Sequence, residues 1–184
     1  MALKATIFKA ALEIADLDRH YYQTHALTIA RHPSETDERM MVRILAFALH
    51  ANDALMFGKG ISTDDEPALW QKDLTGAVEY WIEVGLPDEK LLRRACGQAD
   101  QVIVYTYGGR AAELWWTQNR DKLERNDNLA ILNIPLEASR ELAKLAQRNM
   151  QLQCTIQEGQ IWFAQGDATV PIELSKIKSP PESH

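Results

Sequence analysis

The chain has 184 residues, a formal net charge of −6 and a hydrophobic fraction of 46%. This size favours one domain, and the apolar content excludes a disordered chain. No apolar run approaches the roughly 18 residues of a membrane-spanning helix, and Lys4, Lys9 and Glu13 interrupt the apolar stretch that a signal peptide needs. The spacing of Cys96 and Cys154 matches no metal site and suits reduced thiols. We therefore expect a soluble cytoplasmic protein with no membrane partner, and the acidic balance argues against coating nucleic acid by bulk charge.

The hydrophobic pattern predicts strands and helices along the whole chain. Strands show alternating or continuous apolar residues, whereas helices show apolar residues at spacings of three and four. In chain order the expected elements are strands at 4–14 and 20–30, a helix at 34–52, a short strand near Leu69 and Trp70, a strand at 78–85, a helix beginning at Pro87, a strand at 101–107, a helix at 110–118, a strand at 128–134, a helix at 136–147, and C-terminal strands at 152–157, 161–165 and 169–174.

These elements predict one α/β domain over residues 1–178. The unit at 78–107 has a connection long enough for a parallel crossover, and a hairpin is expected at each chain end. We expect a mixed sheet with a parallel centre and helices packed against it, followed by a disordered tail at 179–184. Ser34 is the expected N-cap of the first helix, because Asp37 follows three residues later.

Carboxylates gather in the middle of the chain. Asp64, Asp65 and Glu66 are consecutive in a loop-like segment, and Glu79 and Glu83 share one face of the strand at 78–85. Such carboxylates brought together would suit Mg²⁺ or Mn²⁺, which can polarise a phosphoryl oxygen. Most acidic runs are solvated, so the residues alone favour a solvated loop over a metal site.

Two further positions leave alternatives open. Glu83 lies among aromatic residues, where an unpaired carboxylate is costly to bury. It is therefore exposed at an edge, ion-paired, or a metal ligand. Glu35 is explained by capping and by the helix dipole, although one of the carboxylates there could turn inward toward a site.

The remaining signals are weaker. Trp115 and Trp116 cannot both face one direction on a helix, so one is expected in the core and the other partly exposed. For the exposed one, a packing or interface role is favoured over stacking on a base. The histidines have no paired spacing that would predict zinc, and no dinucleotide-binding, phosphate-loop or serine-hydrolase motif is present in the sequence. Gly108 and Gly109 before a helix are a weak phosphate-binding signal.

Three motifs occur together with the tryptophan pair: HPSET at 32–36, DDEP-x-LW at 64–70 and WIE-x-G-x-PDE at 81–89. In this combination the sequence resembles the bacterial YaeQ family over nearly the whole chain. The resemblance implies similarity in fold to the PD-(D/E)XK nuclease superfamily, which has a restriction-endonuclease-like α/β core. The expected element order agrees with such a core: a helix, an acidic loop with a strand, an acidic strand, a helix and a strand.

The resemblance also implies roles for individual residues. That superfamily uses an Asp near one strand and Glu-x-Lys on the next, which places Asp65 and Glu83 at the two acidic positions. The expected lysine is Gly85 in this chain. Some members of the superfamily take the lysine from the following helix, which makes Lys90 the candidate, with the next arginines behind it. Glu35 on the first helix would complete the metal shell.

Two hypotheses follow from this resemblance. In the first, the protein is a divalent-metal-dependent phosphodiesterase in which Asp65 and Glu83 bind Mg²⁺ or Mn²⁺, Lys90 assists the attacking water and Glu35 supports the shell. In the second, motivated by the missing lysine, it is a non-catalytic module that binds nucleic acid or protein. Fold alone does not decide between them.

The distribution of charge bears on a nucleic-acid partner. Residues 53–89 hold nine acidic and two basic residues, a net charge of −7. Residues 90–125 hold seven basic and four acidic residues, a net charge of +3. The acidic excess therefore lies in the segment of the expected metal site. The total charge argues against nucleic acid, but its distribution does not, and the distribution does not argue for nucleic acid either.

Overall fold

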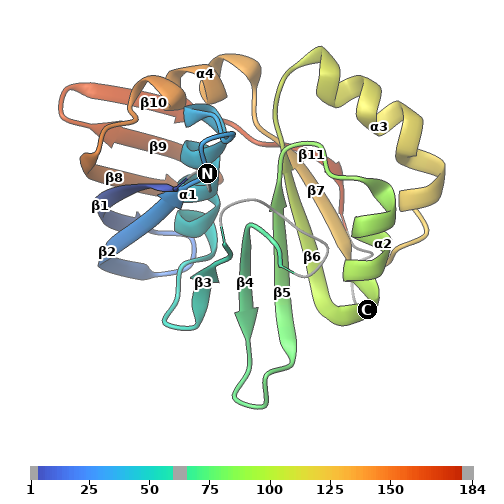
Figure 1. Cartoon of the computed structure of the whole chain (residues 1–184). Helices are drawn as coiled ribbons and strands as arrows, with labels where there is room; N and C mark the ends of the chain where they lie inside the picture. The colour runs from blue at the N-terminus through green and yellow to red at the C-terminus, as the bar shows by residue number, and fades with distance from the viewer. Residues whose placement is uncertain (1–3, 60–65, 180–184) are drawn as a thin grey trace.

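The computed structural model of the chain describes residues 4–59 and 66–179, which form two sheets and four helices (Figure 1). In chain order the elements are β1 (Thr6–Asp16), β2 (Tyr21–Arg31), α1 (Asp37–His50), β3 (Leu55–Phe57), β4 (Leu69–Lys72), β5 (Val78–Val84), α2 (Glu89–Gln98), β6 (Ala99–Thr106), α3 (Arg110–Leu123), β7 (Leu129–Asn133), α4 (Leu136–Lys144), β8 (Asn149–Gln157), β9 (Gln160–Gln165), β10 (Ala168–Ile172) and β11 (Ser175–Lys178). None of the helices in this described part of the chain has the length and hydropathy to cross a bilayer.

The first sheet contains the strands from both chain ends in the order β10-β9-β8-β1-β2. β1 pairs antiparallel with β2 along its full length, and β8, β9 and β10 form an antiparallel meander. The expected terminal hairpins are thus confirmed. The expectation that the hairpins belong to the same sheet as the parallel centre is wrong. β1 pairs in parallel with β8, and the strands of both chain ends form a separate five-stranded sheet.

The second sheet has the order β11-β7-β6-β5-β4-β3. Its centre is parallel, with β5 beside β6 and β6 beside β7, as the crossover unit predicts. The outer strands β3, β4 and β11 are antiparallel. The edge strands β3 and β11, of 3 and 4 residues, were not among the expected elements.

Helix α1 lies between the two sheets, and α2 and α3 cover the opposite face of the second sheet (Figure 1). Residues 40–48 of α1 are all buried. Ile82 and Ile103 point toward α1 and join the core of the first sheet, whereas Trp81 and Val104 point toward α2 and α3. This alternation gives β5 and β6 a buried face on each side, as expected for parallel strands.

Two expected helix ends need correction. The N-cap of α1 is Thr36, whose hydroxyl accepts a hydrogen bond from the Arg39 N–H at 3.1 Å, and not Ser34. Ser34 instead contacts the His32 ring, with 2.8 Å between Oγ and Nδ1, in the turn before the helix. Helix α3 continues to Leu123, which is fully buried against the second sheet. Of the expected tail at 179–184, only residue 179 is among the described residues.

The carboxyl end of α1 is joined to the second sheet by a polar contact inside an aromatic cluster. His50 Nε2 lies 2.5 Å from the Tyr105 hydroxyl oxygen, and the Tyr80 ring lies near the same imidazole. Burial, with a smaller contribution from Arg19, lowers the pKa of His50 to about 4. The imidazole is therefore neutral in the folded protein at neutral pH.

We expect the free energy of unfolding to fall as the solution is acidified, because the unfolded chain binds a proton at His50 that the folded protein does not. The folded pKa is about 4, and the unfolded pKa is about 6.5. The stability that the neutral imidazole supports is therefore present above about pH 6.5 and is lost toward pH 4. Urea denaturation should show a His50 contribution of about 2 kcal/mol between about pH 7 and pH 5.

The His50→Gln variant should lose this part of the pH dependence, because Gln does not titrate and still offers hydrogen-bonding groups to Tyr105. His20→Asn is a matched control: His20 is exposed and has φ 55°, a conformation that Asn tolerates. If the free energy of unfolding of His50→Gln depended on pH as that of the parent does, a lowered pKa of His50 would be contradicted.

Candidate functional site

Glu83 occupies the carboxyl end of β5, on the face covered by α2 and α3. Its side chain is 1% exposed, and its neighbour two residues earlier on that face is the buried Trp81. The Trp81 indole N–H donates to Glu83 Oε1 at 2.9 Å, so the carboxylate is held in a fixed orientation. Of the three alternatives for Glu83, exposure at an edge is excluded.

A cavity of about 260 Å³ opens beside this carboxylate. It lies where β5 ends and the chain turns into α2, and Arg39 reaches it from α1. Its lining residues are Arg39, Glu83, Val84, Leu86, Pro87, Asp88 and Leu91. The cavity is thus lined by two carboxylates, Glu83 and Asp88, from the β5–α2 segment, and by the side chain of Arg39 from α1.

Gly85 and Asp88 shape this turn. Gly85 has φ 95°, a backbone conformation that a residue with a side chain rarely adopts, and its N–H donates to the Tyr105 carbonyl at 2.9 Å. Asp88 is the N-cap of α2 and accepts a hydrogen bond from the Lys90 N–H at 2.8 Å. The glycine at the expected lysine position is therefore required by the local backbone.

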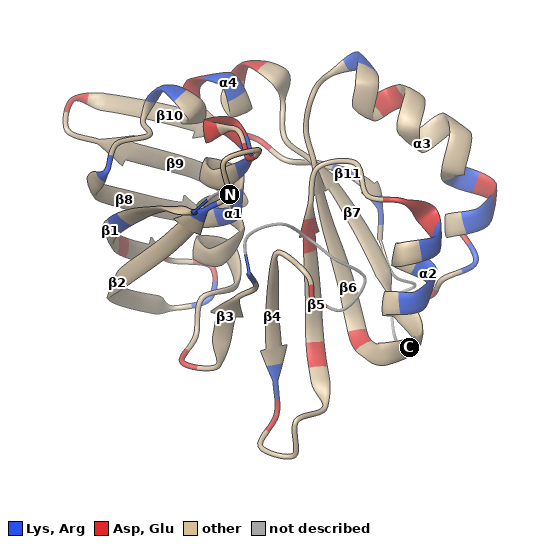
Figure 2. Ribbon diagram, viewed as in Figure 1, with Lys and Arg blue, Asp and Glu red and all other residues tan. Residues whose placement is uncertain are grey.

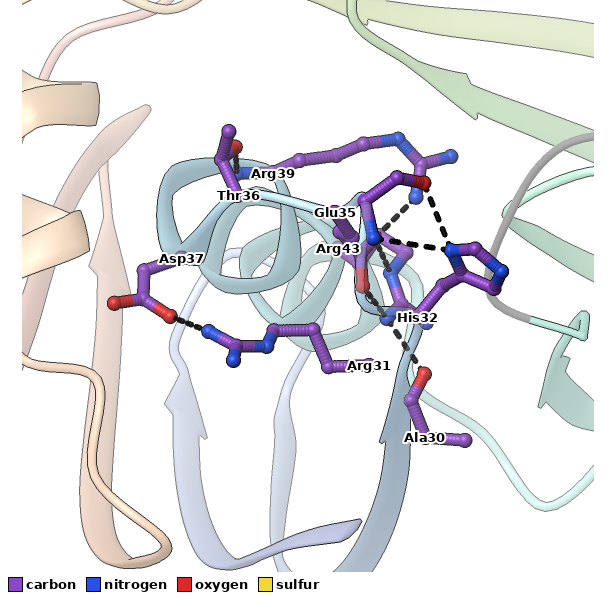
Figure 3. Close-up of polar contacts among 9 residues, drawn as sticks. Ala30, Arg31, His32, Glu35, Thr36, Asp37, Arg39 and Arg43 are labelled. Carbon is purple, nitrogen blue, oxygen red and sulfur yellow. Dashed lines mark hydrogen bonds and ion pairs between the residues drawn. The ribbon is translucent and has the colours of Figure 1, made fainter. Parts of the chain in front are cut away.

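Glu35 forms a buried ion-pair cluster at the start of α1 (Figure 3). Arg43 donates to both carboxylate oxygens of Glu35, through Nη2 at 2.5 Å and Nε at 2.8 Å, and Arg39 Nη1 donates to Oε2. Arg43 is itself only 1% exposed and also donates to the Ala30 carbonyl at 3.2 Å. Burial lowers the pKa of Arg43, and Glu35 opposes that shift.

This cluster gives Glu35 a function that the sequence did not indicate. Its carboxylate anchors Arg39, and Arg39 lines the cavity that contains Glu83. The role of Glu35 in a metal shell stays a prediction. In this structure Glu35 contacts Arg39 and Arg43 and does not itself line the cavity.

The other two predicted residues lie differently. Lys90 is exposed on the first turn of α2 and does not line the cavity. Asp65 lies outside the described residues, so its role as a ligand stays a prediction. Leu69 pairs with Ile82, which shows that the chain enters β4 beside the end of β5 that carries Glu83.

Within residues 4–59 and 66–179, no group of three or more His, Cys, Asp or Glu side chains is arranged to hold a metal ion. The cavity itself offers the carboxylates of Glu83 and Asp88, which are the oxygen ligands that Mg²⁺ and Mn²⁺ prefer. Asp88 entered the sequence analysis only as part of the PDE motif, and Arg39 carried no signal in the sequence. Both belong to the site because the tertiary fold brings α1 to the end of β5.

We expect Arg43→Met to lower the free energy of unfolding by about 3 kcal/mol, because it leaves the buried Glu35 carboxylate with only part of its compensation. Arg31→Met is the matched control, since the Arg31–Asp37 pair at the same helix end is substantially exposed and should contribute less than about 1 kcal/mol. Urea denaturation of both variants checks the difference. Equal losses would contradict a special role for the buried pair.

Comparison with known proteins gives a consistent result over the whole chain. The family model described as YaeQ protein matches residues 1–174. The uncharacterized protein YaeQ of Escherichia coli (strain K12) is 43% identical over 180 residues, which covers 98% of this chain and 99% of that protein. The protein of the same name from Salmonella typhi has the same identity and coverage.

Two solved structures have the same fold. The crystal structure of YaeQ protein from Xanthomonas axonopodis pv. citri matches with a TM-score of 0.91 and 44% identity, covering 96% of this chain and 99% of that chain. The crystal structure of YaeQ protein from Pseudomonas syringae matches with a TM-score of 0.90 and 35% identity, covering 95% and 97%. The family model, the relatives and the solved structures agree, and the chain belongs to the YaeQ family.

Proposed function

We propose that the cavity at the end of β5 hydrolyses phosphodiesters with a bound Mg²⁺ or Mn²⁺. The observation that carries the proposal is that a buried carboxylate, Glu83, and the Arg39 side chain line one open cavity. Burying a carboxylate in a mainly apolar layer is costly unless it is compensated. Titratable groups held in a cleft in this way are frequent at functional sites.

The cavity residues supply the binding groups that such a reaction needs. Glu83 would hold the ion together with Asp65 and with Asp88 at the cavity rim. The register of β4 against β5 supports Asp65 as a second ligand of the ion. Leu69 follows Asp65 by four residues in the sequence and pairs with Ile82, the residue before Glu83. A bound divalent ion lowers the pKa of its water and polarises a phosphoryl oxygen. The assignment to a PD-(D/E)XK-like nuclease core is part of this proposal.

Arg39 is the cation that the cavity offers to the phosphate. Its Nη1 donates to Glu35, and the Arg39 side chain lines the same cavity as Glu83. A planar guanidinium pairs with two phosphate oxygens and suits the charge that develops as water attacks and the alcohol leaves. Lys90, the candidate from the sequence, would have to reach over the rim from the first turn of α2.

The surface beside the site suits a polyanionic substrate. Basic residues occur on α2 and at the carboxyl end of α3 (Figure 2), where Arg93, Lys122 and Arg125 line a surface groove together with Asp121. Arg93 and Lys122 also pair with Glu89. Phosphate backbones bind such surfaces through Lys and Arg with release of counterions. This arrangement supports nucleic acid as the substrate class.

A second function is favoured by one observation. Gly85 occupies the position of the expected catalytic lysine, and its φ of 95° disfavours a lysine there. If neither Arg39 nor Lys90 replaces that group, the same surface would bind nucleic acid without cleaving it. The experiment below separates the two functions.

We expect the purified protein to cleave labelled DNA or RNA oligonucleotides with Mn²⁺ or Mg²⁺ and not with EDTA. Glu83→Gln, which keeps an acceptor for the Trp81 indole, should reduce cleavage to background and weaken Mn²⁺ binding in calorimetry. Arg39→Met should reduce the rate about a hundredfold, because it removes charge stabilisation from the transition state.

The matched control is Glu79→Gln, a partly exposed carboxylate on the same face of β5, which should leave cleavage unchanged. Lys90→Met decides between the two cations: loss of activity in that variant with full activity in Arg39→Met would assign the role to Lys90. Oligonucleotide binding without metal-dependent cleavage would instead support the binding module. Equal background turnover by the parent and Glu83→Gln would refute hydrolysis.

A further inference from the structure

A second cavity, of about 290 Å³, lies under α3 at the carboxyl ends of β6 and β7. Thr106 and Asn133 are the last residues of those strands, and β11 forms the opposite edge of the cavity. In open α/β sheets the crevice outside the carboxyl ends of parallel strands is where ligands bind. None of the residues assigned to hydrolysis above lines this cavity.

The walls of this cavity combine aromatic and polar groups. Two adjacent indoles, Trp115 and Trp116, belong to its lining, with Ile131 from the floor of the sheet. The buried Thr106 hydroxyl donates to Asn133 Oδ1 at 2.8 Å, which fixes the amide plane. Among the residues of the described chain that line it, none is basic, and Glu113 is acidic.

This lining selects a particular ligand chemistry. A phosphate would meet a carboxylate and no cation, so the cavity does not suit an anion. An aliphatic ligand would leave the Asn133 amide without a partner. A flat, uncharged ring with hydrogen-bonding edges suits both the indoles and the amide, and the volume lies at the small end of ligand cavities.

A direct hydrogen bond connects the two cavities. The Trp115 indole N–H donates to the Pro87 carbonyl at 2.8 Å. Pro87 belongs to the lining of the Glu83 cavity, and Trp115 belongs to the lining of the cavity under α3. A ring bound beside Trp115 is therefore a near neighbour of a phosphate bound beside Glu83.

We propose that the cavity under α3, lined by Trp115, Trp116, Thr106 and Asn133, binds a nucleobase. The inference deepens the proposed function: it places a base of the substrate beside the phosphodiester. The base stacks on an indole and is read at its edge by the Asn133 amide, while Glu113 at the rim favours bases that carry an exocyclic amine.

Nucleosides without phosphate test this site independently of metal and of cleavage. Adenosine, cytidine, guanosine and uridine are titrated into ¹⁵N-labelled protein, and the indole N–H signals of its five tryptophans are followed by NMR. We expect saturable shifts at Trp115 and Trp116, with adenosine, cytidine and guanosine binding more tightly than uridine, whose base carries no exocyclic amine. Trp162, on β9 of the first sheet, should not shift.

Two variants and a control make the site falsifiable. Trp116→Ala, which truncates a partly exposed indole, should weaken nucleoside binding about tenfold. Asn133→Ala should reduce the preference among the four nucleosides and is a second variant should the first fail to fold. Trp162→Ala removes another surface tryptophan and should leave the affinity unchanged.

The outcomes distinguish this inference from the proposed function. Absence of saturable binding by every nucleoside, or equal binding by the parent and Trp116→Ala, overturns the base site even if oligonucleotides are cleaved. Nucleoside binding without cleavage supports the base site and removes the hydrolytic function. If the indole signals move instead with protein concentration, and sedimentation shows a dimer that Trp116→Ala abolishes, the occupant is a second copy and the inference fails.

Discussion

The burial of α1 between two sheets is the constraint on which the rest of the structure depends. Residues 40–48 contact protein on every side, so the helix cannot present a polar face to water. Arg43 nevertheless lies within this stretch, and its charge is tolerated because Glu35 accepts two hydrogen bonds from it. The ion pair therefore lies at the start of this buried helix, and Arg39, one turn before Arg43, reaches from the same helix to the cavity at the end of β5.

The site follows from this geometry. Sheet alternation places Glu83 on the far side of β5 from α1, and Arg39 joins it only because the cavity opens at the end of the strand. The same face of the sheet carries the cavity under α3, a short distance along the carboxyl ends of the parallel strands. A substrate that extends along this edge would meet charged groups at β5 and aromatic groups at β6 and β7.

Local signals in the sequence predicted most elements and little of their assembly. The periodicity of 78–84 and of the first helix identifies β5 and α1, and the crossover length identifies the parallel centre of the second sheet. The parallel pairing of β1 with β8 depends on contacts between the two ends of the chain, which no local pattern encodes. The same reason hid Arg39: on its helix it resembles any exposed cation, and only tertiary packing gives it a neighbour in Glu83. Trp115 and Trp116 were correctly divided into a buried and a half-buried residue, although the cavity that both line was not foreseen.

Gly85 has a consequence for how this site could be changed. Its left-handed backbone lets β5 end abruptly, so that Asp88 can cap α2 within reach of the cavity. A side chain at position 85 would strain that turn, although the nearest atom to its added carbon, in the Tyr107 ring, is 4.0 Å away. Engineering a lysine there would thus fail on backbone conformation while space permits it. A new cationic group in this cavity would have to be introduced from α1 or α2, so the turn that shapes the site also determines which helices can supply its chemistry.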